Sequence, residues 1–110
     1  MKRGDMVLAV APGDYGKPRP SVVVQSDLFN PTHESVIVCL LTTELKDSSL
    51  LRLTVEPSPE NGLQAVSQIM VDKLLTLPKK RLRDQIGVLE DDMMAELNGC
   101  LRLVLAITGS

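Results

Sequence analysis

One arginine stands out as a side chain that could bind a phosphate. Arg19 lies between Pro18 and Pro20, and the second proline restricts Arg19 to extended backbone conformations. A guanidinium on so stiff a segment is pre-organised to meet a phosphate with a forked pair of hydrogen bonds. On composition alone, an ordinary surface arginine is the more frequent case. Arg19 therefore needs a second observation before it can be given a role.

A basic run after Pro78 is the second candidate for contact with an anion. Lys79, Lys80, Arg81 and Arg83 give a local positive face to a chain whose formal net charge is −2. Such runs are usually solvated, yet this one could contact the phosphates of a nucleic acid.

Other residues with catalytic or binding chemistry are scarce. The chain has one histidine and two cysteines far apart in sequence, too few for a metal cluster, and no cofactor is expected. His33 lies in a loop with Asn30 and Pro31 and is expected to be a surface residue. Cys39 and Cys100 lie in apolar stretches, where buried thiols are expected. Aromatic residues make up 2% of the chain, with no tryptophan, which argues against a base-stacking platform.

The elements that must position these residues fit one small domain over residues 1–110. Hydrophobic residues make up 44% of the chain, enough for a core without metals or disulfides. Short apolar runs between proline- and glycine-containing loops predict strands. These strands are expected over residues 6–11, 21–25, 35–43, 50–55, 64–72 and 85–87, with one helical turn over 79–83. The run over 35–43 is predicted to be central and the longest, because both its faces are apolar.

The C-terminal region changes to a helical period. Its apolar residues recur at helical spacing, and acidic residues precede them. These residues are Met93, Met94, Leu97, Leu101, Val104 and Leu105, after Glu90, Asp91 and Asp92. Gly99 inside this helix costs roughly 1 kcal/mol relative to alanine, so packing is expected to compensate. The whole pattern predicts a mainly β fold, a small curled sheet or barrel with one amphipathic helix across it.

The sequence shows neither signal peptide nor membrane span, which predicts a cytoplasmic protein.

Several short segments, in order along essentially the whole chain, resemble the MazF/PemK/Kid family. These are messenger-RNA-cleaving toxins of toxin–antitoxin pairs. The segments are Arg3–Val7, Arg19–Asp27, Val38–Thr43, Asp72–Leu77, Lys80–Leu82 and Leu89–Met94. The resemblance implies the SH3-like curled β-barrel with a C-terminal helix that this family shares with CcdB. It also implies a homodimer with RNA in a groove lined by residues 12–19 and 44–50.

The resemblance implies catalytic roles for three residues. They are Arg19, Thr42 (with Thr43 as the alternative) and Asp72, all for cleavage of single-stranded RNA without metal. In that chemistry the 2′-hydroxyl attacks the adjacent phosphate and leaves a 2′,3′-cyclic phosphate and a 5′-hydroxyl. Arg19 would neutralise charge on the phosphoryl oxygens, and Thr42 would donate a hydrogen bond. The base is open among Arg19, Asp72 and Asp14.

The resemblance also implies a second ligand, an antitoxin whose extended tail alternates acidic and apolar residues. Positions expected to bind RNA or antitoxin are Asp14, Tyr15, Lys17, Thr43, Lys73, Lys79, Lys80 and Arg81. The first loop is shorter than is usual in the family, and Met70 stands where some members have arginine. Two alternatives follow: a non-catalytic gyrase poison like CcdB, and a degenerate homologue that only binds antitoxin. The first depends on a C-terminal tryptophan that this chain lacks.

Overall fold

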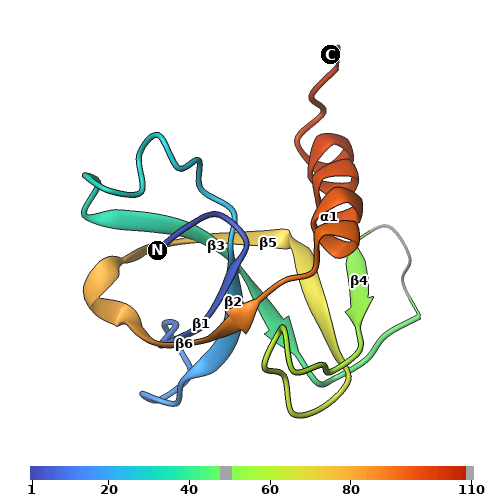
Figure 1. The fold of residues 1–110 in the computed structure, drawn as a ribbon, viewed down its shortest axis with the longest axis horizontal. Helices are drawn as coiled ribbons and strands as arrows, with labels where there is room; N and C mark the ends of the chain where they lie inside the picture. Colours follow the sequence, from blue (N-terminus) through green and yellow to red (C-terminus); the bar gives the residue numbers. More distant parts are fainter. Residues whose placement is uncertain (48–50, 109–110) are drawn as a thin grey trace.

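A computed structural model describes residues 1–47 and 51–108. It contains strands, a single 3₁₀ turn and a C-terminal helix in the predicted order (Figure 1). The elements are β1 (Asp5–Ala9), β2 (Arg19–Val23), β3 (Ser35–Thr42), β4 (Arg52–Val55), β5 (Ser67–Pro78), η1 (Lys79–Arg81), β6 (Leu82–Val88) and α1 (Asp91–Val104).

The strands form one antiparallel sheet in the order β4-β5-β3-β2-β1-β6. The interior position of β3 confirms the prediction that this strand is central. The mainly β fold with a C-terminal helix is also confirmed. The expected barrel is not closed, however. Within the described part of the chain, β4 pairs only with β5 and β6 only with β1, so both edges stay open and the sheet is curled rather than closed.

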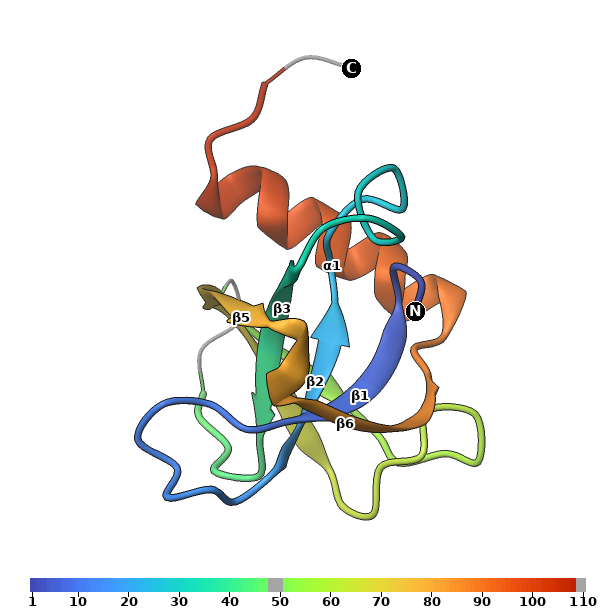
Figure 2. The same ribbon diagram turned by 90° about the vertical axis from the view of Figure 1, so that its left-hand side faces the viewer.

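Two apolar clusters form because successive side chains of a strand point to opposite faces of the sheet. Thus Met6 and Val22 belong to the larger cluster, whereas Val7 and Val23 belong to the smaller one. The larger cluster is the face that α1 covers, and Figure 2 shows the helix crossing above the strands. The alternation confirms that the central strand is apolar on both faces, since Val38 and Cys39 lie in different clusters.

The strand β5 corrects two predictions. It has 12 residues against 8 in β3, and it ends at Pro78 rather than at Asp72. The polar residues Asp72 and Lys73, read as a strand end, lie at a bend where the pairing with β3 shifts register. A bulge of this kind leaves polar side chains exposed without ending a strand, and the following apolar residues continue the pairing.

The other elements differ from the predictions mainly at their ends. The basic run contains the expected turn, but it covers only Lys79–Arg81, and β6 extends from Leu82 to Val88. Of the strand expected over 50–55, Leu50 lies outside the described residues. So do residues 48–50 of the expected groove loop.

The helix α1 confirms the C-terminal prediction in its position and its buried face. Asp91 and Asp92 occupy its first turn, and Leu97 and Leu101 are its buried residues. A Cβ at Gly99 would meet no atom within 4 Å. Gly99 itself faces open space, so the packing that holds α1 on the sheet comes from other residues, chiefly Leu97 and Leu101 in the larger cluster.

Candidate active site

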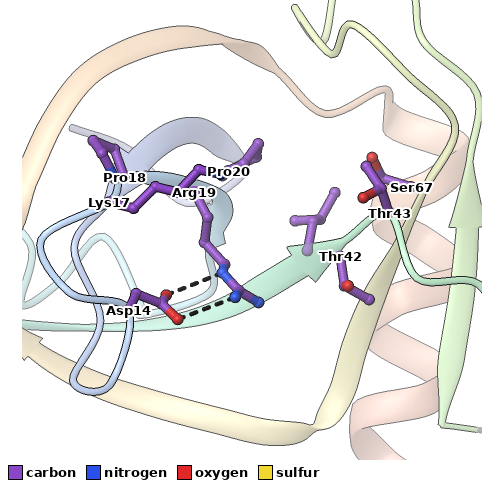
Figure 3. Close-up of a pocket in the computed structure, with 9 residues that line it drawn as sticks. Asp14, Lys17, Pro18, Arg19, Pro20, Thr42, Thr43 and Ser67 are labelled. Carbon is purple, nitrogen blue, oxygen red and sulfur yellow. Dashed lines mark hydrogen bonds and ion pairs between the residues drawn. The ribbon is translucent and has the colours of Figure 1, made fainter.

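The start of β2 sets Arg19 directly opposite the end of β3. Ser21 pairs with Leu40 and Val22 with Cys39, and continuing that register by two residues sets Arg19 against Thr42. Side chains at such facing positions lie on the same side of the sheet, with Cβ atoms about 4.5–5.5 Å apart. Figure 3 shows the guanidinium between Asp14 and Thr42.

On the side away from Thr42, the guanidinium of Arg19 is held by the carboxylate of Asp14. Nη2 donates to Oδ1 at 3.1 Å, and Nε lies 3.0 Å from Oδ2. The side chains are 36% and 20% exposed, so this ion pair is partly shielded from solvent. Nη1 has no hydrogen-bond partner among residues 1–47 and 51–108. One edge of the guanidinium is therefore fixed, and the other can meet a ligand.

The hydroxyl of Thr42 is also held in place. Its Oγ1 accepts a hydrogen bond from the backbone N–H of Glu44 at 3.1 Å. A threonine hydroxyl has one proton to donate and two acceptor positions, so this contact leaves the proton free for a ligand. Thr42 is half-buried, whereas Thr43 is exposed. This geometry favours Thr42 as the donor.

These side chains line an open pocket of about 280 Å³. Its lining residues are Asp14, Lys17, Pro18, Arg19, Pro20, Leu41, Thr42, Thr43 and Ser67. Leu41 and Ser67 were not predicted as site residues, and Ser67 comes from a strand that the sequence did not connect with the site. Ser67 begins β5, and the neighbouring Gln68 pairs with Thr42, so the sheet brings together residues 25 positions apart. No local motif signals such a neighbour.

Several predicted binding residues do not line this pocket. Asp72 and Lys73 are exposed at the bend of β5, and Tyr15 is fully exposed with a left-handed φ of 53°. Lys80 and Arg81 are exposed in η1. The pocket therefore unites Arg19 with Thr42, Thr43, Asp14 and Lys17, but not with Asp72.

Lys79 is held by a different part of the chain. Its ammonium donates to the backbone carbonyl of Asn30, and its backbone N–H donates to the carbonyl of Glu34. These bonds tie η1 to the loop between β2 and β3. The ammonium of Lys79 therefore stabilises the fold.

Other reactive groups have structural surroundings. Burial raises the pKa of Cys39 to about 12, so its sulfur remains a protonated thiol and a poor nucleophile. Both cysteines are free. Within the described ranges, no three His, Cys, Asp or Glu side chains are grouped so that they could hold a metal ion. The described residues also include no helix long and apolar enough to cross a bilayer.

The chain is an antiparallel sheet with one helix and an arginine–threonine pocket at one end, and its sequence matches a known toxin family. The model of PemK-like, MazF-like toxins of type II toxin–antitoxin systems matches residues 2–105. The chain belongs to this family.

Similar proteins extend over nearly the whole chain. A probable endoribonuclease MazF from Mycolicibacterium smegmatis is 42% identical over 110 residues, which are 99% of this chain and 100% of that protein. The endoribonuclease EndoA of Bacillus subtilis is 30% identical, covering 97% of this chain and 96% of EndoA.

Solved structures show the same fold at low sequence identity. A mycobacterial endoribonuclease in complex with its cognate antitoxin has a TM-score of 0.83 at 21% identity, covering 100% of this chain and 99% of that chain. A MazE–MazF structure from Deinococcus radiodurans has a TM-score of 0.78 at 22% identity, covering 98% and 97%.

Proposed function

We propose that this chain is a metal-independent endoribonuclease toxin that cleaves single-stranded RNA at the pocket of Arg19 and Thr42. The observation that carries the proposal is a guanidinium fixed on one edge by Asp14 in a pocket that Thr42 also lines, with Nη1 unpartnered among residues 1–47 and 51–108. Two positioned donors at one site suit a phosphoryl group that gains charge in the transition state. The relatives named as endoribonucleases support the same reaction.

The reaction balances without a metal ion. The 2′-oxygen forms a bond to phosphorus and loses its proton, while the bond from phosphorus to the 5′-oxygen breaks and that oxygen gains a proton from water. Arg19 stabilises the phosphoryl charge, and Thr42 donates to a non-bridging oxygen. Asp14 is the carboxylate that lines the pocket, so we assign the 2′-hydroxyl proton to Asp14 rather than to Asp72. Lys17 adds positive charge for the RNA backbone.

The same pocket is the proposed binding site of an antitoxin. A tail with acidic side chains would pair with Lys17 and Arg19, so antitoxin and RNA are expected to compete. Structures of related toxins with antitoxin support such a partner.

The protein is proposed to act as a homodimer in the cytoplasm, where its RNA substrate is found. Exposed apolar residues near the end of α1, including Leu105 and Ile107, fit a subunit interface.

The test is incubation of the purified protein with single-stranded RNA in the presence of EDTA, followed by end-group analysis. We expect cleavage that gives cyclic or 3′-phosphate and 5′-hydroxyl ends. Uncleaved RNA, or products with 5′-phosphates, would overturn the proposal. Intact RNA together with impaired DNA supercoiling by gyrase would instead select the CcdB-like alternative, which none of the relatives named above favours.

A further inference from the structure

The side chain of Gln68 is buried beside the pocket and fully hydrogen-bonded. Its Nε2 donates to the carbonyl of Lys46 at 3.0 Å and to Oγ1 of Thr54 at 3.2 Å, and its Oε1 accepts from the N–H of Lys46 at 2.9 Å. Both donors and the oxygen of the amide are thereby used within the protein. Gln68 does not line the pocket, so any effect on a ligand must pass through the residues that it holds.

The two bonds to Lys46 continue the pairing of β3 beyond the end of the strand. Gln68 faces Thr42 on one side and Thr54 on the other in the ladders of β5. The chain leaves β3 at Thr42, and four residues later the amide of Gln68 binds both backbone groups of Lys46. This is the donor and acceptor pattern of a strand partner, supplied by a side chain.

The segment between these two points forms part of the pocket wall. Thr43 lines the pocket, and the N–H of Glu44 binds Oγ1 of Thr42. Residues 43–46 are therefore tied to the sheet at both ends. A wall tied in this way is ordered before a ligand arrives, and pre-ordering reduces the entropy cost of binding.

We infer that Gln68 is a positioning residue that holds the segment 43–46 in the shape that binds the RNA backbone. This inference rests on the proposed function of the same pocket. Gln68 touches neither RNA nor the reacting phosphate. It acts on substrate affinity through Thr43 and Lys46, and not on the chemical step at Arg19.

The test compares Gln68→Met with the matched control Thr54→Val. Methionine is close in volume but loses both bonds to Lys46, whereas valine at position 54 removes a different partner of the same amide and leaves the segment tied. The measurements are KM, kcat and the Kd for an RNA with a 2′-deoxy nucleotide at the cleavage site. For Gln68→Met we expect KM and Kd to rise about tenfold, with kcat close to that of the wild type. Hydrogen exchange of the Lys46 amide should accelerate. Thr54→Val should match the wild type in all of these.

Three outcomes would overturn the inference: an unchanged Kd in Gln68→Met, a loss confined to kcat, or an equal rise of Kd in Thr54→Val. If Gln68→Met does not fold, Gln68→Glu serves instead, because it keeps the acceptor for the Lys46 N–H and loses both donors. It is expected to raise Kd, and an unchanged Kd would count against the inference. A wild-type protein that binds RNA but does not cleave it would overturn the proposed function alone. One that binds no RNA would overturn both.

Discussion

Two polar clusters of this molecule use their hydrogen-bonding groups in opposite ways. In the pocket, within the part of the chain that the structure describes, Arg19 is tied to Asp14 on one edge only and the hydroxyl proton of Thr42 has no acceptor. At the start of α1, by contrast, the buried Asn61 has every amide group bonded. Its partner Glu90 also accepts from the hydroxyl of Ser58 at 2.7 Å.

The difference separates binding chemistry from structural chemistry. A buried polar group without a partner costs about 1–3 kcal/mol, so a cluster that only stabilises the fold is expected to satisfy all of its groups. A site that must bind a ligand keeps donors available and stays partly open to solvent. The cluster of Ser58, Asn61 and Glu90, called here the helix-start cluster, follows the first pattern. The pocket of Arg19 follows the second.

The largest expected effect lies in the tight packing around the helix-start cluster. A Cβ at Gly62 would lie 2.0 Å from the carbonyl oxygen of Ile86, at a φ of +73°. Gly62→Ala is therefore expected to destabilise the fold by more than about 4 kcal/mol, measured by thermal unfolding. The matched control is Gly13→Ala, which has a φ of +87° and no atom within 4 Å. It is expected to cost about 1 kcal/mol. Equal costs would show that backbone conformation, rather than close packing, governs Gly62.

The next effect concerns the pocket alone. Thr42→Val keeps the shape but removes the hydroxyl, and we expect the cleavage rate to fall about 10²–10³-fold, with the free energy of unfolding little changed. Thr43→Val is the control and should lose much less activity. Rates measured under single-turnover conditions decide between the two threonines. A larger loss in Thr43→Val would shift the donor role by one residue.

A smaller effect concerns the acid stability of the helix-start cluster. The hydrogen bond from Ser58 is the main reason that folding lowers the pKa of Glu90 below its ordinary value of 4.5. A lowered pKa stabilises the fold above pH 4.5, and this contribution is lost as the pH falls through the folded-state pKa. Ser58→Ala should therefore lose stability at pH 7 and show a weaker fall between pH 5 and pH 3. Urea unfolding across this range measures it, and an unchanged pH dependence would contradict the assignment.

The smallest effect is a gain in stability away from both clusters. A Cβ at Gly99 meets nothing within 4 Å, and alanine is favoured over glycine inside a helix by about 1 kcal/mol. Gly99→Ala should raise the free energy of unfolding by that amount and leave cleavage unchanged. A loss of stability or activity would indicate that this helix surface is covered by a partner in solution.

The positions of the strands and the helix could be predicted from the sequence, but the pairing of the strands could not. Local periodicity was enough for the central strand and for α1. The full length of β5 could not be predicted, because Asp72 and Lys73 read locally as a strand end. Only the pairing of Leu74–Leu77 with β3 carries the strand past that bend. The open edges likewise depend on contacts between strands far apart in sequence.

Part of the candidate site could be predicted from a local restriction of the backbone. Arg19 was found through its flanking prolines, and the resemblance supplied Thr42. Ser67 and Gln68 were missed because only the register between β3 and β5 brings Ser67 into the pocket wall and Gln68 next to Thr42. Asp72 was also supplied by the resemblance, but it does not line the pocket in the structure. Its catalytic role remains an untested prediction.

The most direct test of the account is the cleavage rate of Arg19→Ala in the presence of EDTA, measured beside its thermal unfolding. Because this side chain is predicted to act on phosphate rather than on the core, the rate should fall at least about 10²–10³-fold while folding is retained. Cleavage at the wild-type rate by a folded Arg19→Ala protein would contradict the claim that this pocket is the active site.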